Sequence, residues 1–217
     1  MNKVVIAIDG PAASGKGTLA RKLAEKLNYA HLDTGAIYRM VALQLVQQNI
    51  DYSEFAAVEA ARFVQQNMTE NLMLHPDLRL DEVGTMASKV SAVPEVRSIL
   101  LDAQRHFAQN PPDNYDGSVL DGRDIGTIVC PEANMKLYVT ASVAIRAQRR
   151  LKELQNKGIS ATYDAVLKDM EERDLRDMSR DIAPLKPASD AVILDTSDLT
   201  ADQALKQALE IAVRTLG

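Results

Sequence analysis

Short apolar runs alternate along the chain with longer amphipathic stretches, and this alternation predicts the fold class. The short runs, rich in Val, Ile and Leu, predict buried strands at residues 4–8, 30–32, 118–120, 135–140 and 191–194. Stretches in which apolar side chains recur every three to four positions predict helices at residues 18–27, 37–48, 143–154 and 201–216. Strands that alternate with helices require crossover connections, so we expect an α/β fold with a parallel sheet covered on both faces.

The segment 53–112 departs from this alternation. It begins with a helical pattern, continues with a run at residues 72–80 that resembles a small hairpin, and ends with a further helical pattern. Pro111 and Pro112, followed by Asp113 and Asn114, mark its end. We interpret residues 53–112 as an insertion between two core strands, within a single domain that covers residues 1–217.

Composition and charge act mainly by exclusion. Hydrophobic residues make up 46% of the chain and charged residues 25%, an ordinary globular mixture that can bury a core. The net charge of −5 argues against broad binding to nucleic acid or to an acidic membrane, but not against a small anionic ligand. No stretch approaches the ~20 apolar residues of a membrane span, and the single cysteine, Cys130, favours a reducing compartment. We therefore expect a cytoplasmic protein without nucleic-acid or membrane partners.

The segment 10–18 carries the clearest chemical signal. It follows a predicted buried strand and opens a predicted helix, which is the context of a P-loop. Glycines let the backbone curl so that N–H groups point at phosphate oxygens, the helix N-terminus adds its dipole, and Lys16 adds a charge near the transferred group. An ordinary glycine-rich turn is the alternative, but the lysine and both flanking elements are in register. The predicted ATP-binding residues are Gly10, Pro11, Ala12, Ala13, Ser14, Gly15, Lys16, Gly17 and Thr18.

One position departs from the general P-loop pattern. Gly17 follows Lys16, and Thr18 is displaced by one residue from the place where many P-loop proteins bind Mg²⁺ through a hydroxyl. We therefore predict no direct protein ligand for the metal; the phosphates and water would hold it, with Asp121 as one candidate to bind such a water. The chain has no later Asn-Lys-x-Asp motif, which argues against a GTPase.

Two further segments suit an anionic acceptor. Residues 33–39 start a predicted helix in which Asp33 or Thr34 is a candidate cap and Arg39 follows one turn later. Residues 121–127, which include Arg123 and Asp124, come directly after a predicted strand, where open α/β sheets place their ligands. A capped helix with a surface arginine and a tight turn with a local ion pair are the respective structural alternatives.

A third segment, residues 171–180, is a run of charges on a predicted helix. Arg173, Asp177 and Arg180 are spaced so that they share one helical face, which could offer two cations to phosphates and a carboxylate to ribose hydroxyls. A solvated, salt-bridged helix surface is the alternative. The preceding helix carries a group of arginines near the candidate hinge Gly158, and we interpret residues 148–162 as a short lid. These arginines are Arg146, Arg149 and Arg150.

Taken in order, five segments resemble those of bacterial cytidylate kinases over nearly the whole chain. They are residues 10–18, 33–39, 87–91 with 94–97, 121–127 and 172–180. The resemblance implies a P-loop kinase with a five-stranded parallel sheet, an inserted monophosphate-binding domain, a short lid and a monomeric state. It also implies that CMP and dCMP are phosphorylated by ATP, with Mg²⁺ as the accompanying metal.

The resemblance assigns roles residue by residue. Thr34, Arg39 and Arg123 would receive the acceptor phosphate. Ser88, Arg97 and Asp124 would read cytosine; Arg173 and Asp177 would contact the ribose, and Arg180 the base or the phosphate. The implied catalytic residues are Lys16, Arg123, Arg173 and Arg180. Thr34 stands where many family members have serine, so the hydroxyl is kept and a methyl group is added.

Two other functions remain open at this point. The first is a P-loop kinase for another monophosphate or for a small metabolite alcohol such as shikimate. The second is a non-catalytic, nucleotide-dependent switch. An acceptor screen separates these readings, because only a kinase releases ADP in response to its acceptor.

Overall fold

The protein is described by a computed structural model, which covers residues 3–67, 73 and 75–217. The chain forms two compact units. The first combines Met1–Leu32 with Ala108–Gly217, and the second is Asp33–Phe107. The second unit begins earlier than the predicted insertion at residue 53, because the helix that starts at Thr34 packs against the later helices of this unit.

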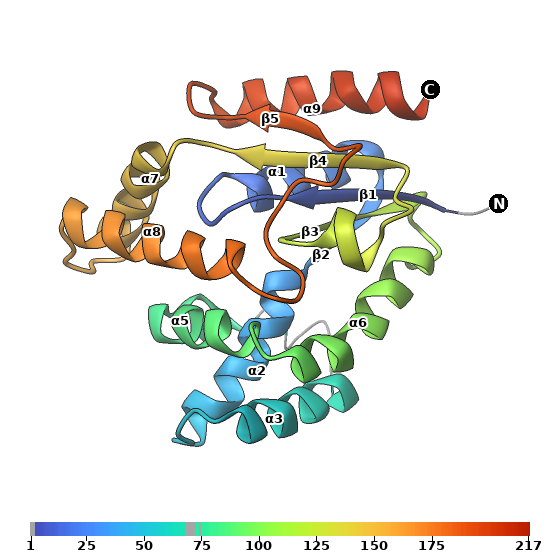
Figure 1. Ribbon diagram of the computed structural model, residues 1–217. Coiled ribbons are helices and arrows are strands. Elements are labelled where there is room, and N and C mark those ends of the chain that lie inside the picture. The colour runs from blue at the N-terminus through green and yellow to red at the C-terminus, as the bar shows by residue number, and fades with distance from the viewer. Residues whose placement is uncertain (1–2, 68–72, 74) are drawn as a thin grey trace. The chain divides into compact units, whose positions relative to one another are not determined.

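The first unit is built on a five-stranded parallel sheet (Figure 1). The strands are β1 (Val4–Asp9), β2 (Tyr29–Asp33), β3 (Gly117–Gly122), β4 (Met135–Thr140) and β5 (Val192–Asp195), in the spatial order β2-β3-β1-β4-β5. All five predicted strands are present, and the predicted α/β fold with a five-stranded parallel sheet is confirmed. In the register, Asp9 lies opposite Gly122 on one side and Tyr138 on the other, so β1, β3 and β4 end side by side.

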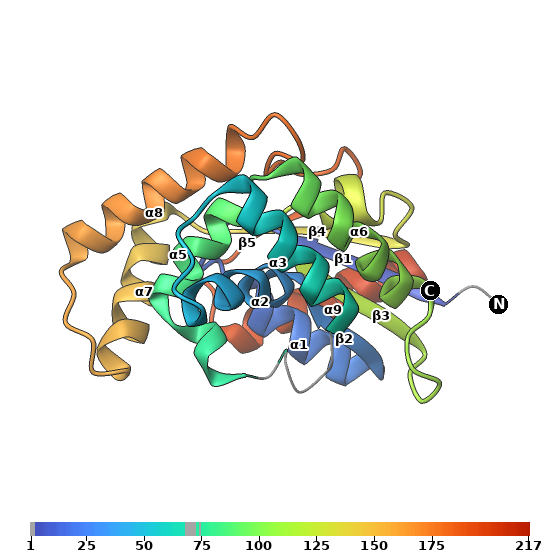
Figure 2. The same ribbon diagram turned by 90° about the horizontal axis from the view of Figure 1, so that it is seen from below.

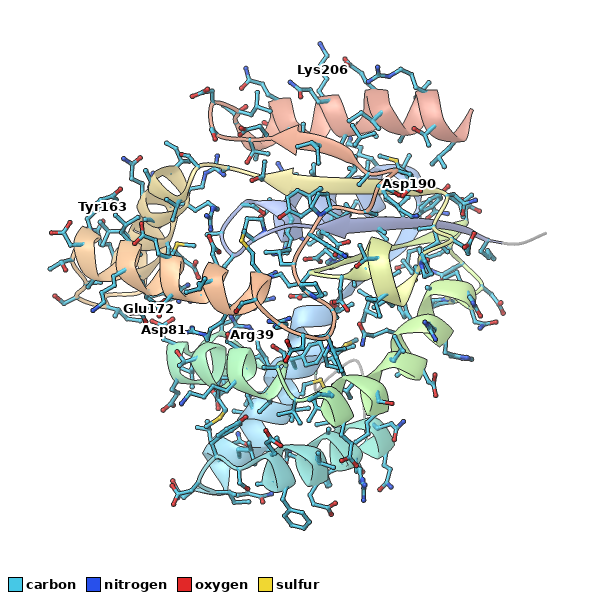
Figure 3. All side chains as sticks on the ribbon, viewed as in Figure 1. Arg39, Asp81, Tyr163, Glu172, Asp190 and Lys206 are labelled. Carbon is cyan, nitrogen blue, oxygen red and sulfur yellow. The ribbon has the colours of Figure 1, made fainter. Side chains whose placement is uncertain are left out.

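One face of the sheet packs on α1 (Lys16–Leu27) and α9 (Ala201–Leu216). Ile6 and Ile8 of β1 lie fully buried with Leu23 of α1 and Ala208 of α9, because alternate strand residues point to the same face. A capping box at Thr200 starts α9. The labelled Lys206 side chain on α9 points away from the sheet (Figure 3), as expected for an amphipathic helix.

A second helical layer of this unit consists of α7 (Val143–Asn156) and α8 (Tyr163–Met178). The two helices lie side by side in both ribbon views (Figures 1 and 2) and bury a small apolar cluster. Val166 and Met170 belong to this cluster, and Tyr163, labelled at the start of α8 in Figure 3, packs against it. Helix α8 therefore buries an apolar face against α7.

The second unit is helical. It contains α2 (Thr34–Gln47), α3 (Glu54–Asn67), the 3₁₀ turn η1 (Pro76–Arg79), α5 (Asp81–Val90) and most of α6 (Pro94–Gln109). Helix α2 is buried along most of its length and packs against α3 and α5. Its large buried side chains include Ile37 and Leu45.

The hairpin predicted at residues 72–80 is wrong where the structure describes that segment. Leu72 and Leu74 lie outside the described residues. Pro76 instead starts η1, and the His75 side chain accepts a hydrogen bond from the Asp77 N–H. The alternation of Leu78 and Leu80 imitates a half-buried strand, but Leu78 is buried in a helical turn and Leu80 is exposed. Proline at the first helical position suits such a turn, because its missing N–H would have no helical partner there.

Candidate functional site

The P-loop joins β1 to α1, and its glycines are required by backbone geometry. Gly10 has φ 153°, and a Cβ atom at this position would lie 2.0 Å from the Val139 carbonyl oxygen on β4. Gly15 precedes α1 with φ 88° and ψ 0°, a conformation that costs little only for glycine. The loop therefore leaves the end of the central strand β1 so close to β4 that only glycine fits at position 10.

Two arginines of α7 hold the carbonyl groups of this loop. The buried Arg146 donates from Nε to the Ala141 oxygen (2.9 Å) and from Nη1 to the Ala12 oxygen (3.3 Å). Its two terminal nitrogens also donate to Asp174 of α8, at 3.1 and 2.5 Å. Because the P-loop carbonyls point toward α7, the N–H groups of the loop point into its concave side, which is where a P-loop binds phosphate.

Arg149 binds the next part of the loop. It donates from Nη1 to the Ser14 oxygen (3.4 Å) and from Nη2 to the Thr196 oxygen (2.6 Å). The Thr196 hydroxyl itself donates to the Ser14 oxygen at 2.9 Å. Our expectation that Arg146 and Arg149 are lid cations does not match these contacts, because both guanidinium groups hold backbone carbonyls. Arg150 forms an ion pair with Glu153 at 2.8 Å.

Lys16 and Asp121 lie beside the same loop. Lys16 Nζ donates to the Pro11 oxygen at 3.3 Å. The buried Asp121 is the last residue but one of β3. Its Oδ1 lies 2.8 Å from Nε2 of His31, and its Oδ2 lies 3.5 Å from the position that a Cβ of Gly17 would take. A cation and a carboxylate therefore lie at the start of α1.

Asp9 connects the end of β1 to the segment after β3. This buried carboxylate accepts hydrogen bonds from the N–H groups of Ile125 and Gly126, each at 2.7 Å. These residues begin η2 (Ile125–Val129), a short π-helical turn that follows Asp124. Burial raises the pKa of Asp9 from 3.8 to about 6, although the two N–H groups and Lys16 act in the opposite direction.

An arginine–carboxylate cluster lies between the β3 end and α8. Arg123 Nε donates to Asp177 Oδ2 at 2.9 Å, and Arg180 donates to Asp177 Oδ1. Although burial by itself would raise the pKa of Asp177, the charges of Arg123, Arg180 and Arg173 outweigh it and hold this pKa below its usual value. The solvated helix surface that we considered for this run does not describe Asp177, which is 2% exposed, although Glu171, Glu172 and Arg176 are exposed.

One detail of that prediction is wrong. Helix α8 ends at Met178, so Arg180 does not share a helical face with Arg173 and Asp177. Arg180 reaches Asp177 from the segment that follows the helix instead. The Asp177 carbonyl oxygen also accepts a hydrogen bond from the Leu185 N–H at 2.8 Å, which holds that segment against the helix end.

The predicted acceptor residues of the second unit include Thr34 and Arg39. Asp33 caps α2 by accepting from the Ala36 N–H at 3.1 Å, and Thr34 is buried in the first turn. Arg39, labelled on α2 in Figure 3, donates from Nη1 to the Leu78 oxygen at 2.8 Å. Its guanidinium lies against Gly84 of α5, where a Cβ would be 3.1 Å from both terminal nitrogens. Glycine at this position thus makes room for Arg39.

Ser88 and Arg97 are also buried in this unit. Ser88 is 6% exposed, and its hydroxyl has no hydrogen-bond partner within the described part of the chain. Arg97 is 8% exposed; it donates to the Ser91 oxygen at 3.1 Å, and its guanidinium carbon lies 5.4 Å from the centre of the Tyr38 ring. Apart from the family resemblance of residues 87–91 and 94–97, no local sequence pattern marks either residue for chemistry. Burial of an arginine and of an unpartnered hydroxyl is the signal, and only the folded chain carries it.

Comparison with known proteins decides the family. The family model described as cytidylate kinase matches residues 6–214. The chain belongs to the cytidylate kinase family. The resemblance that the five sequence segments indicated is therefore confirmed, and the chain is a phosphotransferase of the kinase class.

Curated members of this family are similar over nearly the whole chain. A cytidylate kinase of Paramagnetospirillum magneticum is 56% identical over 95% of this chain and 96% of its own length. A cytidylate kinase of Rhodospirillum rubrum is 53% identical over 96% of each. A solved structure of an uncharacterized protein from Eubacterium ventriosum has a TM-score of 0.56 at 15% identity, covers 96% of this chain and 97% of its own, and shares the fold.

No helix in the described residues is long and apolar enough to cross a membrane. Within residues 3–67, 73 and 75–217, no three His, Cys, Asp or Glu side chains gather as a metal ion would require.

Proposed function

We propose that the chain transfers the terminal phosphoryl group of ATP to CMP and dCMP, with ADP and CDP or dCDP as products. The observation that carries this proposal is the strand register. Asp9 lies opposite Gly122, so the P-loop and Arg123 leave neighbouring strands at the same level. This register supports the proposal, because open α/β folds bind ligands at this end of the sheet, and a P-loop that binds the donor phosphates would lie beside an Arg123 that binds the acceptor phosphate.

The P-loop residues 10–18 are proposed to bind the ATP phosphates. The carbonyls of Ala12 and Ser14 are held by Arg146 and Arg149, which supports an inward orientation of the loop N–H groups. Lys16 would then place its ammonium near the transferred group. A loop whose geometry is fixed before ATP arrives loses little entropy on binding.

The acceptor phosphate is proposed to bind Thr34, Arg39 and Arg123. Ser88, Arg97 and Asp124 are proposed to read the cytosine, and Arg173 and Asp177 to contact the ribose, with Arg180 beside the base or phosphate. The buried, unpartnered hydroxyl of Ser88 supports its role, because a base would satisfy it. Asp177 now binds Arg123 and Arg180, so a ribose hydroxyl would compete with those ion pairs.

Catalysis is proposed to rest on positioning and charge neutralisation. The acceptor phosphate is already a nucleophile, so no side chain needs to act as a strong base. The proposed catalytic residues are Lys16, Arg123, Arg173 and Arg180. Each would supply positive charge that stabilises the phosphoryl group in the transition state.

Mg²⁺ is proposed to enter with ATP. The residues present fit this view: Asp121 presents a carboxylate next to Gly17, and such an oxygen can hold a metal-bound water. Gly17 itself offers no hydroxyl. When bound, Mg²⁺ neutralises phosphate charge and fixes the geometry of the phosphate chain.

Cytosine selectivity is proposed to come from hydrogen-bond matching. A carboxylate such as Asp124 can accept from the exocyclic amine, while Arg97 can donate to the ring carbonyl and N3. Uracil reverses two of these groups and leaves buried polar atoms unpaired, at about 1–3 kcal/mol each. An Asp124→Ala variant should therefore lose its preference for CMP over UMP, and an unchanged preference would remove Asp124 from the base site.

The first experiment is a coupled ADP-release assay with ATP and Mg²⁺ that offers CMP, dCMP, UMP, AMP, GMP and shikimate separately. Strong turnover with CMP and dCMP alone supports the proposal, and a flat response to all acceptors contradicts it. Lys16→Ala should abolish most of the rate while CMP binding persists. Lys22→Ala is the matched control on the same helix, since Lys22 is partly exposed and pairs with the exposed Asp202.

Three further points are part of this proposal. The segment 53–112 is proposed to belong to the monophosphate-binding part, and residues 148–162 to act as the lid. The lid range covers the end of α7 and the loop that contains Gly158, with φ 73°. We also propose a cytoplasmic monomer without nucleic-acid partners, which light scattering on the purified chain would test for mass.

A further inference from the structure

The buried carboxylate of Asp9 has no part in the roles assigned so far. Asp9 is 4% exposed and ends β1, directly before the P-loop. Both of its oxygens are used by the backbone N–H groups of Ile125 and Gly126, 116 and 117 residues away in sequence. Burial of a charged carboxylate costs solvation free energy, which the hydrogen bonds to the segment after β3 must offset.

The two N–H groups that Asp9 binds determine where Asp124 sits. Asp124 is the residue that immediately precedes η2, and its carbonyl oxygen accepts from the N–H groups of Ile128 (2.9 Å) and Val129 (3.1 Å). The first N–H groups of such a turn have no partner within the turn itself. Asp9 therefore fixes the start of η2, and with it the backbone that carries the Asp124 side chain.

We propose that Asp9 is a positioning residue for acceptor-base selection, which ties the Asp124 backbone to the strand that carries the P-loop. This inference rests on the proposed role of Asp124 in reading cytosine. Asp9 touches no reacting atom. It acts through the two N–H groups, and its loss lets Asp124 move relative to the base while the P-loop keeps its own anchors on α7.

Several charged or titratable groups surround Asp9. Asp124 lies near it and Lys16 faces it from α1, with opposite effects on the carboxylate. Tyr138 is its register partner on β4, and Lys136 of the same strand packs against Gly126. Burial is the largest influence on the carboxylate and favours its protonated form at mildly acidic pH. Protonation places a hydrogen on one of the two oxygens that accept from the N–H groups of η2. Asp9 then loses one acceptor, and its hold on the start of η2 weakens.

The experiment compares Asp9→Asn with wild type in the ADP-release assay, with CMP and UMP as acceptors. Asparagine has the size of aspartate but offers one accepting oxygen in place of two. We expect kcat/KM for CMP to fall by about tenfold and the CMP-over-UMP ratio by a similar factor, while KM for ATP changes less than about twofold. Asp116→Asn is the matched control, an exposed carboxylate at the opposite end of β3 that binds Asn28 and should change none of these values.

A pH series makes the test specific. The phosphate of the acceptor titrates in the same range, with a pKa of about 6, but it does so equally with both enzymes. The wild-type to Asp9→Asn ratio of kcat/KM for CMP should therefore be largest near pH 8 and approach one near pH 5. A ratio that stays constant with pH, or an Asp9→Asn enzyme with normal base preference, overturns the inference.

Two controls keep the result interpretable. If the wild type shows no CMP turnover, the proposed function is wrong. If the wild type is active and Asp9→Asn keeps the wild-type CMP-over-UMP ratio, only this inference is wrong. If Asp9→Asn does not fold, the wild-type CMP-over-UMP ratio is measured from pH 8 to pH 5, because both acceptors carry the same phosphate. The CMP-over-UMP ratio should decrease when the pH is lowered past about 6, and a ratio that does not change with pH would contradict the role of Asp9.

Discussion

Arg146→Ala should weaken both the fold and ATP binding, because this one side chain joins three parts of the first unit. Its guanidinium donates to Ala141 at the end of β4, to Ala12 in the P-loop and to Asp174 on α8. The side chain is 6% exposed and that of Asp174 is 13% exposed, so solvent replaces few of these bonds. The variant leaves a buried carboxylate and two carbonyls without their donor.

The expected loss follows from these contacts. Removal of one partner of a buried ion pair costs about 3–5 kcal/mol. Water that enters the space left by the guanidinium can satisfy part of the exposed carbonyls, so we expect a total near 4 kcal/mol rather than the sum of all terms. A domain with about 5–15 kcal/mol of stability can lose this amount and remain partly folded.

Urea unfolding and ATP kinetics test this prediction together. The unfolding midpoint should drop for Arg146→Ala, and KM for ATP should rise by about tenfold because the Ala12 carbonyl is no longer held. Arg150→Ala is the control on the same helix; its partner Glu153 is half exposed, and the loss should stay below about 1 kcal/mol.

A double-mutant cycle assigns the effect to the ion pair. Asp174→Ala alone should also destabilise the protein, and the double variant should lose clearly less than the sum of the two single losses. If Arg146→Ala costs no more than Arg150→Ala, the contacts of Arg146 do not hold the first unit together; if the two losses simply add, the ion pair with Asp174 does not contribute.

Three other perturbations have defined outcomes. Gly10→Ala should cost about 3 kcal/mol or more by urea unfolding, because its Cβ would lie 2.0 Å from the Val139 oxygen; a wild-type midpoint would contradict this. Gly84→Ala should raise the free energy of unfolding by at most about 0.5–1 kcal/mol, because alanine is favoured over glycine within a helix. The same variant should raise KM for CMP, since its Cβ would lie 3.1 Å from the Arg39 guanidinium. Unchanged acceptor kinetics would argue against Arg39 as a phosphate ligand. Asp9 has a pKa raised from 3.8 to about 6 because burial disfavours its charged form, so ionisation of this carboxylate should lower the free energy of unfolding by about 3 kcal/mol as the pH rises from 4 through 6; Asp9→Asn should lack this dependence in unfolding measured from pH 4 to 7.

Much of the fold was determined by local sequence. Apolar runs such as residues 135–140 and amphipathic stretches such as residues 201–216 carry their own periodicity, and the structure places a strand and a helix at those bounds. The P-loop was equally readable, because strand, glycines, lysine and helix follow one another without a break. Prediction failed where a short pattern fits two structures: Leu78 and Leu80 suit a strand as well as a turn, and Arg180 suits a helix that in fact ends at Met178.

The sequence by itself therefore determined the order of elements, the P-loop and, through resemblance, the family. The tertiary structure decided which side chains act together. The bonds of Arg146 to Ala12 and of Asp9 to Ile125 join residues more than 100 positions apart, so no local pattern can contain them. The buried Ser88 hydroxyl has the same origin. Periodicity reports which face of an element is apolar, whereas burial of a polar group and the choice of its partner depend on elements that meet only when the chain has folded.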